Sequence, residues 1–253
     1  MYRPAPAARL APFAAAAALA LAAHAAAAAD ACSVRSARTV APVVELYTSE
    51  GCNSCPPADR WLSRLKADPD VVALAFHVDY WDRLGWKDRF ASADYTRRQA
   101  QQQTVNGARF SYTPQVVVDG QDRKDWPGIA TPLAGRRPPA PVEVVLAREG
   151  DRVRATVAAA PGSPKRLAAY WAVTEQGHVT AVKAGENRGA TLQHDFVVRD
   201  YRTVPAWTPR AGTPQELAFE LPARADAAHP RDVNLVVVDA DSGRPVQALK
   251  LGC

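Results

Sequence analysis

The chain has 253 residues, of which 47% are hydrophobic and 23% charged, and its formal net charge at pH 7 is +5. A chain of this length can bury a sizeable core and suits two small domains better than one. The basic residues are scattered along the sequence, without the stripe or cluster that nucleic-acid-binding proteins carry, so we expect no nucleic-acid partner.

The N-terminus has the pattern of a secretory signal peptide. Residues 1–10 contain two arginines and no acid, and an alanine-dominated apolar run follows up to about Ala29. A basic start, an apolar core and small residues at the end predict a signal peptide over residues 1–29, cleaved after Ala29 or Ala31. The alternative is a membrane anchor, but alanine is weakly apolar and no basic stop-transfer cluster follows. We therefore expect a periplasmic or secreted protein with no membrane span after cleavage.

The segment 41–65 predicts a strand, a tight turn and a helix. Side chains alternate over residues 41–48, which is typical of a strand. Gly51 breaks this pattern, and Pro56 suits the first turn of a helix because its missing N–H would have no partner there. The residues that follow share one apolar helical face at spacings i, i+3, i+4 and i+7: Ala58, Trp61, Leu62 and Leu65. Cys52 and Cys55 therefore lie in the turn between the strand and the helix.

The following segments predict a second strand, a helix and a hairpin. The nearly continuous apolar run over residues 70–80 suits a strand buried on both faces of a parallel sheet, and completes a βαβ unit. Ser92 as a cap and Gly107 as a stop predict a helix from about Ala93 to Val105. A strand over residues 115–118 then leads into an Asp-Gly turn, the usual signal of a hairpin.

The C-terminal half predicts a different architecture. Residues 122–141 are rich in proline, glycine and arginine, which marks a linker between domains. Beyond it, roughly seven short β segments separated by turns predict an antiparallel sandwich over residues 142–253. The predicted organisation is an α/β domain over residues 30–121, the linker, and an all-β sandwich domain.

The cysteine pair Cys52 and Cys55 suits three kinds of chemistry. A structural zinc usually needs two ligand pairs, but a second cysteine pair is absent and the five histidines show no ligand spacing, so we expect no metal. A structural bridge across two residues would constrain little of the unfolded chain. In a redox pair, the helix N-terminus would stabilise a Cys52 thiolate through unpaired N–H groups, and Cys55 would resolve a mixed disulfide.

Several motifs resemble known redox domains. "VELYTSEGCNSC" is similar to the opening of a thioredoxin or glutaredoxin domain, and "YTPQVVVDG" resembles the cis-proline loop of the same fold. Together with "HVDYWDRLGWKDRF" and "GENRGATLQHDFVVRDY", they resemble a family of secreted bacterial proteins of uncharacterised function with a thioredoxin-like domain. The resemblance implies an α/β thioredoxin-like fold class for the first domain.

The same resemblance implies roles for individual residues. Cys52 would be the nucleophile, Cys55 the resolving thiol, Pro114 a cis-proline facing the pair, and Thr113 a backbone contact for a bound substrate strand. The implied partners are protein or small thiols and disulfides, or a redox partner protein, with no organic cofactor. The glycine pair that helps glutaredoxins to hold glutathione is replaced by "QDRKDWPG", which argues against glutathione as the specific partner.

The aromatic segment around residues 80–86 has two interpretations. Trp81 and Trp86 could form a substrate-binding wall beside Cys52, or the segment could be a structural cap over the sheet edge. Two other residues have a catalytic and a structural reading. Glu45 could accept a proton, although alternation places it on the face opposite Leu46, and His77 is better explained as a core histidine.

The remaining cysteines, Cys32 and Cys253, lie at the two ends of the mature chain. An even cysteine count in an oxidising compartment, with the other two already paired, predicts a disulfide between them. The alternatives are two free thiols or a lipidated Cys32. The sequence thus predicts an exported thiol–disulfide oxidoreductase acting through Cys52 and Cys55. The rival is a secreted, non-catalytic binding module in which the Cys52–Cys55 bridge is only structural.

Overall fold

A computed structural model describes residue 1 and residues 32–253, except for residues 132, 134, 136 and 224–226. Nearly all of the predicted signal peptide, residues 2–31, therefore lies outside the described residues. Among the helices that are described, none is both long enough and apolar enough to cross a membrane.

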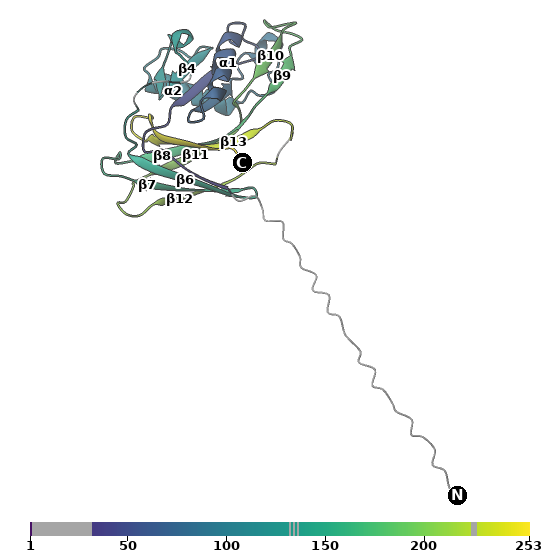
Figure 1. The fold of residues 1–253 in the computed structure, drawn as a ribbon. Coiled ribbons are helices and arrows are strands. Elements are labelled where there is room, and N and C mark those ends of the chain that lie inside the picture. The colour runs from purple at the N-terminus through teal and green to yellow at the C-terminus, as the bar shows by residue number, and fades with distance from the viewer. Residues whose placement is uncertain (2–31, 132, 134, 136, 224–226) are drawn as a thin grey trace.

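An eight-stranded sheet of mixed direction forms the centre of the molecule (Figure 1). Its strands are, in spatial order, β14 (Pro245–Leu251), β13 (Arg231–Asp239), β8 (Leu167–Glu175), β11 (Val197–Trp207), β3 (Val72–His77), β2 (Val43–Thr48), β4 (Gln115–Val118) and β5 (Gln121–Asp122). β3 is parallel to both of its neighbours, β2 and β11, and the other neighbouring strands are antiparallel. Strands from both halves of the chain therefore share one sheet.

A second, antiparallel sheet covers one end of the large one (Figure 1). Its strands are β1 (Cys32–Arg35), β6 (Val142–Glu149), β7 (Arg152–Ala159) and β12 (Gln215–Glu220). Alternate residues of β6 are buried, because one face of this sheet meets solvent while the other packs on the core. That core contains Leu146 from β6, Trp171 from β8 and Leu235 from β13.

The two α-helices lie on opposite faces of the β2–β3 part of the sheet. On one face, α1 (Pro56–Ser63) and the 3₁₀ turn η1 (Arg64–Ala67) pack their apolar side chains against β2. On the other face, α2 (Ala93–Val105) places Tyr95 against Phe76 of β3. The predicted span of α2 is confirmed, and Ser92 caps it by accepting a hydrogen bond from the N–H of Asp94.

A short hairpin completes the fold beside α1 (Figure 1). Its strands are β9 (His178–Ala181) and β10 (Thr191–His194), joined by a loop over residues 182–190 that we call the cover loop. Two further 3₁₀ turns are η2 (Asp82–Leu84) and η3 (Trp126–Gly128).

The predicted fold class, an α/β thioredoxin-like domain followed by a separate all-β sandwich, is wrong. The described residues are mostly β structure with two α-helices, and strands from both predicted domains form the large sheet. The reason lies at β3: its nearly continuous apolar run predicts a buried strand but does not show which strands pair with it. The edge of β3 that would end a small first domain is paired with β11, where the N–H of Ala75 donates to the carbonyl of Phe196 at 2.8 Å.

A buried polar network joins β2, α2 and β8 on the α2 face. The carboxylate of Glu45 accepts hydrogen bonds from Arg98 Nη2 at 2.6 Å, and from the hydroxyls of Tyr170 and Tyr47 at 2.5 Å each. Burial alone would raise the pKa of Glu45, but the charge of Arg98 and these hydrogen bonds outweigh it and lower the pKa. Glu45 thus has its bonding partners on the α2 face, away from α1, in agreement with the alternation of β2.

The two ends of the described globular region are joined by a disulfide. Cys32 in β1 is bonded to Cys253, which follows β14, with 6.5 Å between the Cα atoms. The bond therefore connects the four-stranded sheet to the outer strand of the eight-stranded sheet.

Candidate functional site

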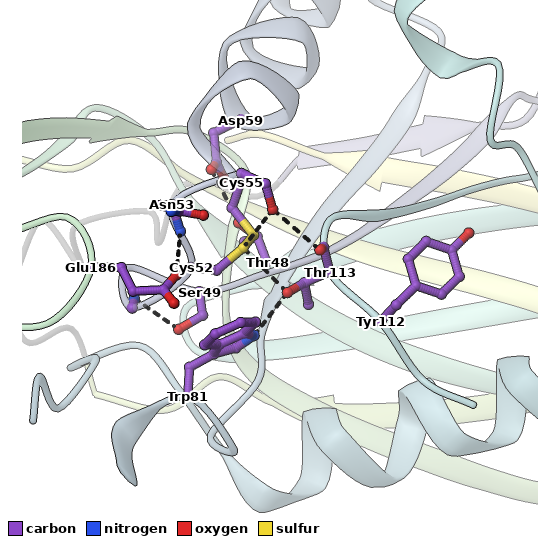
Figure 2. Close-up of a disulfide and its surroundings, with 12 residues drawn as sticks. Thr48, Ser49, Cys52, Asn53, Cys55, Asp59, Trp81, Tyr112, Thr113 and Glu186 are labelled. Atoms are coloured by element: carbon purple, nitrogen blue, oxygen red, sulfur yellow. Dashed lines mark hydrogen bonds between the residues drawn. A yellow bond between two sulfur atoms is a disulfide. The ribbon is translucent and has the colours of Figure 1, made fainter. Parts of the chain in front are cut away.

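The second disulfide joins Cys52 and Cys55 in the turn that leads from β2 into α1 (Figure 2). Cys55 is the N-cap residue of α1, and the two Cα atoms are 5.5 Å apart. Thr48, the last residue of β2, reaches under this turn and donates a hydrogen bond from Oγ1 to Asp59 Oδ2 at 3.0 Å. The turn is thus held between the end of the strand and the first turn of the helix.

The N-terminus of α1 differs from the sequence expectation of free backbone donors. Its first two positions are Pro56 and Pro57, which have no N–H. The next two N–H groups, of Ala58 and Asp59, both donate to the carbonyl of Cys55, at 2.8 and 3.2 Å. The first turn therefore directs its backbone donors at a carbonyl oxygen, unlike the arrangement expected from the sequence.

The hydrogen-bonding contacts of the Cys52 sulfur come from side chains (Figure 2). Thr113 Oγ1 donates to Cys52 Sγ at 3.3 Å, and the same oxygen accepts a hydrogen bond from Trp81 Nε1 at 2.8 Å. Ser54 Oγ lies 3.4 Å from Cys52 Sγ. The structure thus brings Trp81, Thr113 and both cysteines together, and the peptide bond between Thr113 and Pro114 is cis.

The disulfide is fully covered, with no exposed surface on either Cys52 or Cys55. Part of the cover comes from the cover loop, where Asn187 Nδ2 donates to the carbonyls of Glu50 and Cys52 at 2.9 Å each. Glu186 Oε2 accepts a hydrogen bond from the N–H of Asn53 at 3.1 Å. Sequence reasoning did not select Glu186 or Asn187, although both belong to the quoted motif "GENRGATLQHDFVVRDY".

Trp86, the other predicted substrate contact, is engaged by neighbouring groups. Its Nε1 donates to Glu50 Oε2 at 2.8 Å, and its Cβ packs against Gly185 of the cover loop so closely that a methyl there would come within 3.1 Å. Gly185 also has a φ of +72°, which disfavours any other residue. Trp86 therefore supports the cover loop, and its role toward substrate stays a prediction.

A buried cluster of ionisable groups lies on the same side of the sheet. His77 Nδ1 is 2.6 Å from Asp88 Oδ2, and His194 in β10 lies with its ring centroid 5.0 Å from that of His77. Burial opposes a charge on His77, but Asp88 outweighs it and raises the pKa of His77, and the same pairing lowers the pKa of Asp88 to about 2. Asp59 of α1 also faces His194, with its Oδ1 3.6 Å from His194 Nδ1.

Fold and site together describe a mostly β protein with a covered disulfide at a strand–helix turn and a buried histidine–carboxylate cluster beside it. The family described as "Protein of unknown function (DUF1223)" matches residues 43–239, and the chain belongs to this family. The resemblance to an uncharacterised family is therefore confirmed, whereas its thioredoxin-like character is not.

Two solved structures are similar to the chain. The X-ray crystal structure of protein AGR_C_4864 from Agrobacterium tumefaciens is 28% identical in sequence, covers 85% of this chain and 96% of its own, and has a TM-score of 0.60. HBP35 of Porphyromonas gingivalis is 14% identical, covers 86% of this chain and 76% of its own, and has a TM-score of 0.61, a likeness of fold alone. No curated protein matches the chain.

Proposed function

We propose that the chain is a thiol–disulfide oxidoreductase that exchanges disulfides with protein or small thiols through Cys52 and Cys55. The observation that carries the proposal is the asymmetry of the two sulfurs. Cys52 Sγ accepts a hydrogen bond from Thr113 Oγ1, which is in turn held by Trp81 Nε1. A hydroxyl donor stabilises a thiolate more than a thiol, so this chain of donors favours Cys52 as the nucleophile and leaving group.

The proposed exchange proceeds in two steps, in which every bond broken is matched by a bond formed. A partner thiolate attacks Cys52 Sγ, the Cys52–Cys55 bond breaks, and Cys55 leaves as a thiolate that takes a proton from solvent. A second partner thiolate then attacks the partner sulfur of the mixed disulfide and releases Cys52 as a thiolate. Two electrons pass from the partner dithiol to the protein, and reduction of a partner disulfide is the same sequence in reverse.

Access to the disulfide requires the cover to move. Because both cysteines are fully buried, an attacking thiolate needs an opening of the surrounding contacts, and we propose that those of Asn187 with the turn open first. The two disulfides of the described chain are compatible with a periplasmic or extracellular location, where such partners are available. We therefore include export through the predicted signal peptide in the proposal.

The burial also favours a second candidate, a secreted binding module in which the bridge is structural. Two measurements separate the candidates. A Cys55→Ser variant has no resolving thiol, so an oxidoreductase should accumulate mixed disulfides with partners from a periplasmic extract, while Cys52→Ser should not. The reduction potential of the Cys52–Cys55 bond should lie above about −300 mV for an exchanging pair. A lower reduction potential, together with no mixed disulfides accumulated by Cys55→Ser, would support the binding module instead.

A further inference from the structure

We propose that Asp59, His77 and His194 form a binding site for one divalent transition-metal ion, with zinc as the best match. This site is separate from the redox proposal and does not depend on it. The three residues come from α1, from the end of β3 and from the end of β10, which are far apart in the sequence. One ligand atom from each lies within 4.8 Å of the others, and all three side chains are buried.

The ring nitrogens that face this site make no hydrogen bond, and those of His194 only face carboxylate oxygens at 3.6 and 3.7 Å. His77 Nε2 and both nitrogens of His194 make no hydrogen bond to any described residue, and neither does Glu50 Oε1. The exposed fractions of His77 and His194 are 0% and 2%. Buried polar atoms without partners are rare and costly, so several of them pointing together indicate a missing ligand.

Each histidine also has a carboxylate at the ring nitrogen that points away from the proposed metal position. His77 Nδ1 is bonded to Asp88, which also accepts the N–H groups of Glu50 and Phe90 at 2.9 Å each. His194 Nε2 is 3.7 Å from Glu50 Oε1, while the other oxygen of Glu50 is held by Trp86. Metal-binding histidines commonly carry such a carboxylate on the nitrogen away from the metal, where it fixes the tautomer.

This arrangement assigns a ligand atom to each residue. His77 would bind through Nε2, because its Nδ1 is bonded to Asp88. His194 would bind through Nδ1, because this nitrogen faces the proposed ligand Asp59, whereas its Nε2 faces Glu50. Asp59 would bind through Oδ1, since Thr48 occupies its Oδ2. Oδ1 of Asp59 and Nδ1 of His194 are 3.6 Å apart. Bonds of about 2.0–2.1 Å to a tetrahedral zinc separate two ligand atoms by about 3.3 Å. Since the three ligand atoms lie within 4.8 Å of one another, they must approach by up to about 1.5 Å to close the site.

The donor set selects the class of ion. Two imidazoles and one carboxylate suit zinc and its first-row neighbours, whereas calcium and magnesium prefer oxygen ligands throughout. Three carboxyl groups, of Glu50, Asp59 and Asp88, face these two histidines in the buried cluster, and a divalent cation complements such a set of oxygen atoms.

The site also has a route to solvent. A surface pocket of about 110 Å³ is lined by Asp59 and His194, together with Pro56 and Arg60 of α1. On the inner side, the ring of Phe90 packs against both histidines, with centroid distances of 5.2 and 5.8 Å. An ion can therefore enter beside α1, and a water from the pocket can complete its coordination.

The test measures zinc binding by the oxidised protein. Protein stripped with EDTA is incubated with zinc sulfate, dialysed and analysed for metal, and its affinity is measured by competition with a chromophoric chelator. We expect about one zinc per chain. Asp88→Asn should weaken the affinity about 10–100-fold through the orientation of His77, and His194→Gln should weaken it by more than about 100-fold. The Cys52→Ser/Cys55→Ser double variant should bind as the parent does, which excludes thiolate ligands.

His178→Gln is the matched control, because His178 is a buried histidine paired with His194 across the same hairpin. It should keep the full affinity. Cobalt(II) binding to the parent protein provides a second readout, which does not depend on whether a histidine variant folds. We expect visible absorption bands of an ion with nitrogen and oxygen ligands and no thiolate charge-transfer band. The proposal is overturned if the parent retains no zinc, or if His194→Gln folds and binds zinc as tightly as His178→Gln.

Discussion

On the α2 face of β2 and β3, the buried Glu45 carboxylate has both oxygens hydrogen-bonded. On the α1 face, the ring nitrogens of the buried His194 make no hydrogen bond to a described residue and face carboxylate oxygens at 3.6 and 3.7 Å. The α2 face also contains unbonded atoms, Arg98 Nε and Gln99 Oε1, but Arg98 Nη2 and Gln99 Nε2 of the same side chains are hydrogen-bonded. Both faces bury charged groups, but the Glu45 network is bonded more completely than the cluster around His194. A network that is satisfied within the chain serves the fold, and one that is not marks a place for chemistry or a ligand.

Removing Arg98 should produce the largest effect on stability. In Arg98→Ala, Glu45 stays buried without its cation, which should lower the free energy of unfolding by about 3–5 kcal/mol. Urea denaturation followed by near-UV circular dichroism measures the loss. Arg97→Ala is the control: this neighbouring arginine is exposed and paired with Asp94, and its removal should change stability by less than about 0.5 kcal/mol. Equal effects of the two variants would contradict a structural role for the Glu45 network.

The next effect is a pH dependence on the α1 side, from His178. Burial disfavours its charged form, and the pKa falls from 6.5 to about 4. The unfolded chain therefore binds this proton at higher pH than the folded chain does. The contribution of neutral His178 is complete above about pH 6.5 and is lost as the pH falls through about 4. His178→Gln should flatten the rise of the urea midpoint between these two pH values, and an unchanged slope would show that another group causes the rise.

Loosening the cover loop should change reactivity more than stability. Asn187→Ala removes the donor from two buried carbonyls, of Glu50 and Cys52, and each lost bond costs about 1–3 kcal/mol locally. We expect reduction of Cys52–Cys55 by dithiothreitol to become about tenfold faster or more, since about 1.4 kcal/mol corresponds to a factor of ten. Arg188→Ala, at an exposed position of the same loop, should react at the parental rate. A parental rate in Asn187→Ala would mean that other residues limit access.

The smallest effect is expected at the sulfur itself. Thr113→Val keeps the side-chain shape but removes the hydroxyl that donates to Cys52 Sγ, a bond with a net value of about 0.5–1.5 kcal/mol. In a Cys55→Ser background, the pKa of Cys52 should rise by up to about one unit, seen as a shift in the pH profile of alkylation. Thr104→Val, which removes an exposed hydroxyl bonded to the carbonyl of Ala100, should leave the profile unchanged. An unchanged pKa of Cys52 in Thr113→Val would show that groups other than Thr113 stabilise the thiolate.

Local elements of the fold were predictable from the sequence because their signals are local. Ser92 and the residues after it define α2 with the predicted bounds, and the alternating residues before Cys52 define β2, which begins at Val43 and not at residue 41. The strand over residues 115–118 is likewise confirmed. Each of these depends on capping, turn chemistry or side-chain periodicity within a few residues.

The arrangement of the sheet and most of the site were not predictable in this way. A continuous apolar run marks β3 as a buried strand but does not reveal that β11 pairs with it, so residues 30–121 were expected to form a domain of their own. Nor does any spacing connect His77 with His194, since their approach depends on where the β9–β10 hairpin packs. Residues of the cysteine turn were found because their chemistry lies within one short motif. Asn187 and Asp59 act across long sequence separations that a single sequence does not show.

The disulfide between Cys32 and Cys253 closes the polypeptide between these residues into a covalent ring. Tension applied at the two cysteines passes through the sulfur–sulfur bond and does not load the strands of either sheet. A single cut by a protease in an exposed turn, such as that around Gly150 between β6 and β7, leaves one covalently connected molecule. The chain thus has one disulfide that closes a ring of more than 200 residues and a second, buried one that spans three residues and lies about 20 residues after Cys32.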